Sequence, residues 1–392
     1  MHLHTGRAVA LVALVLACVL TLGNAVRPAH ADDQDCDALP TAVIHHTVGS
    51  RPQHVFIIVL ENESYDETFG PNSKAPYLSK CLSKKGQLLT NYYAIGHYSL
   101  DNYIAMVSGQ SPNPETQGDC PTFTEFSLDK PALDANGQAV GHGCVYPPDV
   151  RTIANQLEEK GGLKWHGYME DMKGTCEHPG LGETDPHQSA TSNSQYATKH
   201  NPFVYFHSIS VEDCKTNDVP LDQLKSDLDK VESTPNLSFI VPNLCNDGHD
   251  HDRKTGKCAD GKTDGGLVAI DAFLRRIVPM IMNSKAYQQD GMLIVTFDEA
   301  DADGANADAS ACCGEPTGPN LQNSSPGLFG AGGGKIGTVI ISPFVKPGIP
   351  NSKSYNHYSL LRSLENLFGL RPHLGYAEKP DPGEFGNDMC NQ

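Results

Sequence analysis

Three apolar stretches of this chain each lead into side chains that could bind a metal ion. The stretches cover residues 54–60, 237–241 and 292–297. The polar side chains that follow them are Glu61, Asn62, Asp247, His249, Asp298 and Glu299. Carboxylates gathered in one place repel one another unless a cation lies between them, and oxygen ligands with imidazole suit a hard or borderline divalent ion. The pattern predicts a metal site, with a solvated acidic rim or a structural calcium site as the alternatives.

A serine stands where a helix is expected to begin. Ser99 directly precedes residues 100–107, in which apolar side chains recur with the spacing of one helix face. Serine at this position usually caps the helix by accepting a hydrogen bond from a free amide. The same position offers amides and a positive dipole to a phosphate, and a metal ion can activate a hydroxyl that is otherwise a poor nucleophile. Ser99 therefore has two interpretations, an N-cap and a nucleophile.

The apolar stretches belong to an alternation of predicted strands and helices. Strands are predicted at residues 54–60, 163–168, 237–241, 292–297 and 338–341, and helices within residues 100–107, 153–157, 267–277 and 360–368. This alternation is typical of an α/β sandwich, in which apolar strands form a buried parallel sheet. Ligands of such sheets gather beyond the carboxyl ends of the strands. The fold would therefore bring the acidic side chains to one edge.

Residues 1–31 have the features of a secretory signal peptide. They hold Arg7, an apolar run over residues 8–22 and small residues that end at Ala31. The run is too short for a stable membrane span, so we expect export with cleavage near Ala31, and a retained anchor is the alternative. No low-complexity linker or repeat divides the remaining sequence, so residues 32–392 are expected to form one catalytic domain.

The chain is strongly acidic. Its formal net charge is −18, and the charge becomes −20 when Arg7 and Arg27 leave with the signal peptide. A protein of this charge is not expected to bind nucleic acid. An anionic substrate would need the field to be reversed locally, which a bound cation can do.

Eleven cysteines follow the predicted signal peptide, and in an exported chain they are expected to form disulfides. The pairs suggested by proximity in the sequence are Cys120–Cys144, Cys176–Cys214 and Cys245–Cys258. Spacing alone does not fix the pairing. The odd count leaves at least one thiol free or bonded to another molecule.

Seven segments match the motifs of a known family in order. They are VLENESYDETFG, GHYSLDNYIAMVSG, WHGYMEDM, KHNPFVYF, FIVPNLCNDGHD, TFDEAD and NHYSLLRSLENLFGL, between residues 54 and 370. The chain resembles the bacterial phosphoesterase family that groups acid phosphatases with phospholipases C, a branch of the alkaline-phosphatase-like superfamily. The block E-N-x-S-[YF]-D-x-x-F-G is a specific part of the match. The resemblance implies a three-layer α/β sandwich, with a mainly parallel sheet between helices, that hydrolyses phosphoesters with a metal ion.

The resemblance also implies a role for each matching residue. The implied metal ligands are Glu61, Asn62, Asp247, His249, Asp298, Glu299 and His357. The implied phosphate contacts are Asn62, His97, His200 and His357. Ser99 would form a phosphoserine intermediate, and His97 or His200 would give a proton to the leaving group. Each of these histidines has an alternative interpretation as a structural residue.

The resemblance leaves the metal and the exact shape of the site open. One or two divalent ions are expected, of zinc, magnesium, manganese or calcium. A second ion could use Asp247, His249 or His251. Tyr98 and Asp101 stand where many relatives are expected to have proline, so the turn at Ser99 could differ from theirs.

The leading hypothesis is an exported, acid-phosphatase-like phosphomonoesterase. A phospholipase C acting on phospholipid head groups and a binding protein without activity are the alternatives. Residues 301–310 lack the closing glutamate of an EF-hand and are expected to form an acidic surface loop. The long segment 300–335 is expected to be a lid that shapes substrate choice.

Overall fold

The structure is a computed structural model of the 392-residue chain. It describes residues 36, 39, 51–321, 325–379 and 383–385. The predicted signal peptide, residues 1–31, and its cleavage site lie outside the described residues. Among the residues that are described, no helix has the length and apolarity that crossing a membrane requires.

A central sheet positions the rest of the described chain. In spatial order its strands are β12 (Asn351–Asn356), β2 (Gln87–Tyr93), β11 (Lys335–Ile341), β10 (Gly291–Phe297), β1 (His54–Leu60), β7 (Leu237–Val241), β5 (Trp165–Met169) and β6 (Asp218–Pro220). Within this sheet β11 is antiparallel to both of its neighbours, and the other pairings are parallel. The prediction of a mainly parallel sheet is confirmed.

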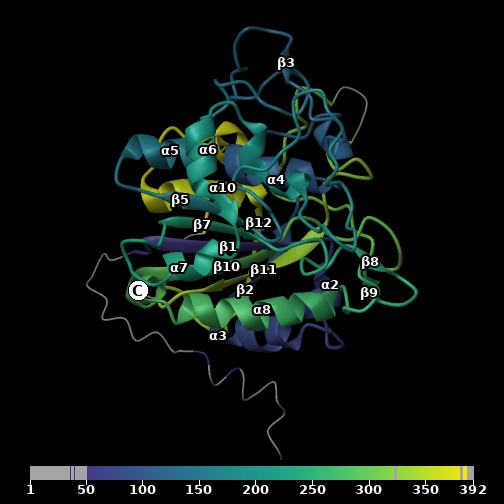
Figure 1. Ribbon diagram of the computed structural model, residues 1–392, viewed down its shortest axis with the longest axis vertical. Helices are drawn as coiled ribbons and strands as arrows, with labels where there is room; N and C mark the ends of the chain where they lie inside the picture. Colours follow the sequence, from purple (N-terminus) through teal and green to yellow (C-terminus); the bar gives the residue numbers. More distant parts are fainter. Residues whose placement is uncertain (1–35, 37–38, 40–50, 322–324, 380–382, 386–392) are drawn as a thin grey trace, which may run out of the picture.

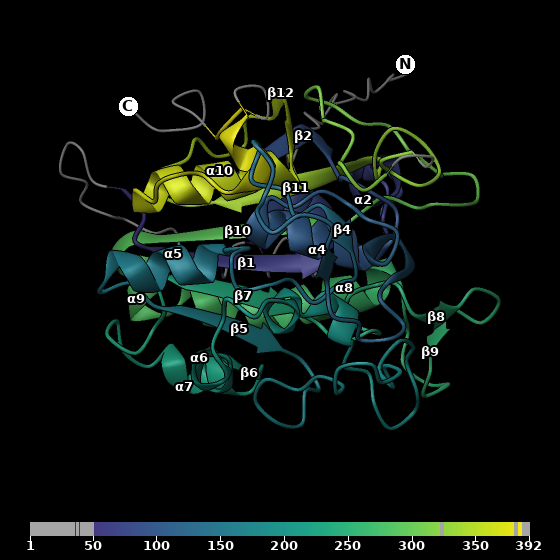
Figure 2. The same cartoon turned by 90° about the horizontal axis from the view of Figure 1, so that it is seen from above.

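Helices cover both faces of the sheet (Figure 1). One layer contains α4 (Ser99–Ser108), α5 (Ile153–Lys160), α6 (Val211–Asn217) and α10 (His357–Phe368), and the opposite layer contains α3 (Ser83–Lys85) and α8 (Leu267–Met282). Shorter helices are α2 (Tyr65–Phe69), α7 (Gln223–Asp227) and α9 (Lys285–Asp290). Seen from above, α10 and α5 lie along the same side of the strands (Figure 2). The three-layer α/β sandwich is therefore confirmed.

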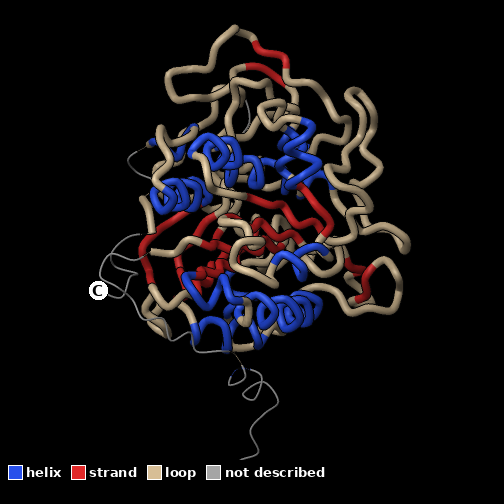
Figure 3. The backbone as a smooth tube through the Cα atoms, turned by 60° about the vertical axis from the view of Figure 1, so that its left-hand side comes forward, coloured by secondary structure: helices blue, strands red, loops and turns tan. Residues whose placement is uncertain are grey.

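Burial explains why these strands form the centre. Every residue of β1 and of β7 is buried, as expected for apolar runs that pair on both sides. Long loops border the molecule beyond the sheet, around the small pairs β3 (Ser127–Leu128) with β4 (Gly141–His142) and β8 (His251–Asp252) with β9 (Lys257–Cys258) (Figure 3).

Disulfides close several of these loops. The three pairs predicted from sequence proximity, Cys120–Cys144, Cys176–Cys214 and Cys245–Cys258, are present. Two further disulfides join Cys36 to Cys81 and Cys312 to Cys313. Cys390, the remaining cysteine of the predicted mature chain, lies outside the described residues.

Candidate active site

The candidate site lies where β1 and β10 end. The two strands are parallel and in register, with Leu60 opposite Phe297, so Glu61 and Asp298 leave the sheet side by side. The Asp298 amide donates a hydrogen bond to the Leu60 carbonyl over 2.8 Å. The Glu61 amide donates to the Asp247 carbonyl over 3.0 Å, which brings the segment after β7 to the same place. The sheet thus gathers the predicted acidic side chains at one edge.

Ser99 begins α4 and faces this edge. Its hydroxyl donates a hydrogen bond to Glu61 Oε2 over 2.7 Å, and Tyr103 donates to the other oxygen of Glu61, also over 2.7 Å. Tyr98 holds the N-cap position, and no side-chain capping bond is formed there. The N-cap interpretation of Ser99 is therefore wrong, because its hydroxyl is directed to a buried carboxylate.

The turn before Ser99 is strained and held by a second carboxylate. Tyr98 has a φ of 134°, a region that side chains other than glycine rarely occupy. Its amide donates to Glu299 Oε2 over 2.7 Å, and the Asn62 side-chain amide donates to Glu299 Oε1. The Asn62 backbone amide donates to Asp298 Oδ1 over 3.1 Å. These bonds fix Ser99 relative to the ends of β1 and β10.

His200 lies between two buried carboxylates. Its Nε2 is 3.4 Å from Glu61 Oε1 and its Nδ1 is 3.5 Å from Asp247 Oδ2. The ring stacks on Tyr103 with centroids 5.3 Å apart. One ligand atom from each of Glu61, His200 and Asp247 lies within 4.8 Å of the others. This spacing suits a shared ion, so the geometry favours His200 as a ligand over a proton donor.

Burial gives the site its electrostatic character. It raises the pKa of the carboxyls of Glu61, Asp247 and Glu299 well above the usual range, and neighbouring carboxylates raise these pKa values further. Burial also raises the pKa of Asp298, to about 6, and lowers the pKa of His200 well below its usual value. A neutral imidazole among crowded carboxylates is the donor set that a divalent ion takes.

Several buried atoms at the site have no hydrogen-bond partner among the described residues. They are Asn62 Oδ1, Asp247 Oδ2, Asp298 Oδ2 and both ring nitrogens of His200. Unpaired buried polar atoms are costly, and an ion would satisfy them. The residues present therefore fit a bound divalent metal.

The other predicted histidines take different positions. His357 is fully buried behind the site, with Nε2 2.6 Å from the Asp298 carbonyl oxygen and Nδ1 3.2 Å from the Tyr92 hydroxyl. Both of its nitrogens are thus occupied, which favours a role in positioning Asp298. The His97 Nε2 donates to the Asp308 carbonyl, while its Nδ1 makes no hydrogen bond within the described chain and lies 3.8 Å from Glu299 Oε2. His249 lies on the pocket wall, with its amide bonded to Asp247 Oδ1.

A buried ion pair at the site was not predicted from the sequence. Lys199 donates to Asp119 Oδ2 over 2.9 Å, and both side chains are 9% exposed. The other oxygen of Asp119 accepts a hydrogen bond from the Leu100 amide, so this amide at the start of α4 is already bonded within the protein. Lys199 stands beside His200 in the KHNPFVYF segment, so that motif was the available signal.

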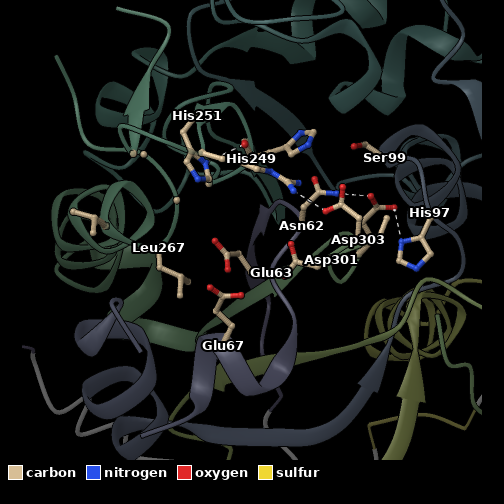
Figure 4. Close-up of a pocket in the computed structure, with 18 of the residues that line it drawn as sticks. Asn62, Glu63, Glu67, His97, Ser99, His249, His251, Leu267, Asp301 and Asp303 are labelled. Atoms are coloured by element: carbon tan, nitrogen blue, oxygen red, sulfur yellow. Dashed lines mark hydrogen bonds and ion pairs between the residues drawn. The ribbon is translucent and has the colours of Figure 1, made fainter. Parts of the chain in front are cut away.

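One pocket of about 780 Å³ opens at the site (Figure 4). Of the residues described above, its lining includes Asn62, His97, Ser99, Asp119, Lys199, His249 and Glu299. Ser99 and His97 lie at one end, and Glu63 and Glu67 lie toward the other. The segment 300–335 supplies part of the wall, including Phe329. Residues 302–307 are exposed, as expected for an acidic surface loop. Asp301, at the start of this loop, lines the pocket, and its backbone amide donates a hydrogen bond to the Ser64 hydroxyl.

Comparison with known sequences identifies the family. The model of the Phosphoesterase family matches residues 71–371, which include Ser99, Asp298 and His357. The chain belongs to the phosphoesterase family. A probable acid phosphatase of Kluyveromyces lactis is 27% identical over 85% of this chain and 62% of the relative. A phosphate-repressible acid phosphatase of Penicillium chrysogenum is 27% identical, with coverages of 88% and 66%.

A third relative of this phosphoesterase is covered more fully. A phosphatidylinositol-3-phosphatase of Mycobacterium tuberculosis is 27% identical over 84% of this chain and 81% of the relative. The chain spans about two thirds of the length of the two fungal relatives. Among solved structures, a Vibrio parahaemolyticus protein of the alkaline phosphatase superfamily aligns with a TM-score of 0.47 and 14% identity, covering 86% of this chain and 69% of that one.

Proposed function

We propose that this phosphoesterase is an exported, metal-dependent phosphomonoesterase that uses Ser99 as its nucleophile. The observation that carries the proposal is the hydrogen bond from the Ser99 hydroxyl to Glu61, a fully buried carboxylate in the candidate ligand group. The acid phosphatase relatives support the reaction class. The disulfides support export.

Glu61, His200 and Asp247 would hold the ion, with Asp298, Glu299 and Asn62 facing the same space. When bound, a divalent ion supplies positive charge to the phosphoryl oxygens and promotes ionisation of a nearby hydroxyl. One or two divalent ions, of zinc, magnesium, manganese or calcium, stay the prediction for this site.

The protein groups account for the proton and charge movements. The Ser99 oxygen attacks phosphorus, the bond to the leaving oxygen breaks, and Glu61 Oε2 lies where it receives the hydroxyl proton. Lys199 places a cation beside the incoming phosphate. His97 lines the pocket and, when protonated at Nδ1, donates to the leaving oxygen. A water oxygen then attacks the phosphorus of the phosphoserine, and the bond from phosphorus to the Ser99 oxygen breaks. This step releases phosphate and restores the Ser99 hydroxyl.

A phospholipid phosphoester is a second candidate substrate. Phe329 is 62% exposed and Tyr98 is 38% exposed, and both line the pocket that holds Ser99. Exposed aromatic side chains at this place would contact an apolar leaving group. The phosphatidylinositol-3-phosphatase relative favours a lipid monoester over a phospholipase C substrate.

The test compares the turnover of p-nitrophenyl phosphate and p-nitrophenyl phosphorylcholine, with and without chelator. We expect monoester turnover that the chelator removes and that Ser99→Ala lowers by at least about 10³-fold. Ser108→Ala, at the other end of α4, is the matched control. Unchanged turnover in Ser99→Ala would exclude Ser99 as the nucleophile, and the absence of turnover by the metal-loaded protein would favour a binding protein.

A further inference from the structure

A second group of carboxylates lies in the same pocket, apart from the candidate metal ligands. One oxygen from each of Glu63, Glu67 and Asp301 lies within 4.8 Å of the others. Glu63 and Glu67 follow β1, and Asp301 follows β10, so the group stands beyond the same edge of the sheet. Glu63 and Glu67 face each other in the pocket, with Asp301 beside them (Figure 4). Both glutamates occupy positions that the E-N-x-S-[YF]-D-x-x-F-G block leaves free.

Glu63 is the member of this group that requires a partner. Glu63 is only 7% exposed and lines the pocket. Among the described residues, none forms a hydrogen bond or an ion pair with its carboxylate. Glu67 accepts a hydrogen bond from Asn306, and Asp301 Oδ2 is 3.4 Å from the Ser64 hydroxyl. A buried carboxylate that faces two others and lacks a donor is unstable as an anion unless a cation joins it.

The protein's own cations do not fill this role. Arg253 lines the pocket but is paired with Asp303 over 2.7 Å, and Lys199 is paired with Asp119. Lys74 also lines the pocket and acts on Glu63 only at a distance, since no ion pair joins them within the described residues. Arg253 likewise acts on Asp301 only at a distance. Within the described residues, no ion pair therefore joins the three carboxylates to a lysine or an arginine.

The backbone on the facing wall leaves room beside Glu63. Gly266 has a φ of +61°, and a Cβ added to it would lie 3.8 Å from Glu63 Oε1 and 3.5 Å from His251 Cε1. The His251 Nδ1 is 3.2 Å from the His249 carbonyl oxygen. The missing side chain thus keeps a small space open between His251 and the carboxylate.

We propose that Glu63, Glu67 and Asp301 bind a second divalent cation in the outer part of the pocket. Three carboxylates offer the hard oxygen ligands that Ca²⁺, Mn²⁺ or Mg²⁺ takes. This ion is separate from the one proposed at Glu61, and the proposal does not depend on Ser99 being a nucleophile. Its position at the pocket wall places positive charge near the path of an anionic substrate.

The test measures bound metal in the whole protein. The protein is stripped with chelator, dialysed against CaCl₂ or MnCl₂, and analysed for metal per chain, with calorimetric titration of the same ions. The variants are Glu63→Gln and Glu67→Gln at the proposed site, Glu61→Gln at the other site, and Asp303→Asn as the matched control. Asp303 lines the same pocket but is paired with Arg253.

We expect Glu63→Gln and Glu67→Gln to lose one bound ion per chain and to keep the ion that Glu61→Gln loses. Asp303→Asn should bind as the unchanged protein does. An unchanged ion count in both glutamine variants overturns the proposal. Glu63→Gln that is more stable to heat and keeps every ion would show that a proton, not a metal, neutralises Glu63. If Glu61→Gln loses activity but keeps the ion at Glu63 and Glu67, the outer site is supported as a separate site.

Discussion

At the scale of single residues, the candidate site combines side chains at the ends of a strand and a helix with a buried ion pair between distant parts of the chain. Glu61 and Asn62 follow one strand directly, and Ser99 begins one helix, so pattern and motif identified them. The Lys199–Asp119 pair was not predicted, because 80 residues separate its members, and the motif beside Lys199 does not indicate which carboxylate it meets. The pairing of distant charges depends on the fold, which residue types alone do not encode.

Lys199 gives the first prediction at this scale. Lys199→Met removes a cation from the pocket that Ser99 also lines, so we expect KM for p-nitrophenyl phosphate to rise about 10–100-fold while kcat changes less. The inhibition constant of inorganic phosphate should rise in parallel. Lys199→Arg should restore part of the affinity, because it keeps the charge.

A matched control for Lys199 is Lys257, which forms an exposed ion pair with Asp264 over 2.6 Å. Lys257→Met should leave KM and phosphate inhibition unchanged. If Lys199→Met lowers the melting temperature but leaves phosphate inhibition as it was, the pair serves only the structure of α4.

At the scale of elements, burial decided which strands could be predicted. β1 and β7 match their predictions to the residue, because a run buried on both faces has no competing pattern. β12 was missed because its first four residues are polar and not fully buried at the edge of the sheet. β2 was missed because buried and half-buried positions are mixed along it. Such strands form through pairing with neighbours, which the local sequence does not reveal.

Glu365 in α10 gives a prediction about stability. Burial raises the pKa of its carboxyl from 4.5 to about 8. The folded state therefore holds a proton that the unfolded state releases, and stability falls as the pH rises from about 4.5 to about 8 and levels off above. Glu365 Oε2 and Gln156 Oε1 are buried without hydrogen-bond partners among the described residues. In Glu365→Gln, the new amide group offers a hydrogen-bond donor to Gln156 Oε1.

Glu365→Gln should therefore flatten the fall in stability between pH 5 and pH 8. At pH above 8 we expect the variant to be more stable than the unchanged protein by on the order of 1–2 kcal/mol, measured by urea unfolding. Glu212→Gln, an exposed glutamate of α6, should reproduce the original pH dependence. An equally steep fall in Glu365→Gln would show that another group holds the proton.

At the scale of the whole molecule, strong acidity and a buried acidic site belong together. The chain carries a formal charge of −18, and Glu61, Asp247, Asp298 and Glu299 are all buried within its fold. The family resemblance implied this concentration of charge, but only the fold shows how completely water is excluded from it. One sheet holds strands from residue 54 to residue 356, and the single domain over residues 32–392 stays a prediction. Folding therefore brings together carboxylates whose mutual repulsion the proposed ion would offset.

This coupling predicts that removing the metal destabilises the folded state. An ion that binds only the folded state adds about 2.7 kcal/mol when its concentration is 100 times its dissociation constant. In the Glu67→Gln background, which lacks the proposed outer ion, chelator should lower the melting temperature by about 3–4 °C, and added divalent ion should restore it. Glu61→Gln in that background should melt at the same temperature with and without chelator. A melting temperature that stays constant while metal analysis shows the ion has left would mean that protons alone neutralise the site.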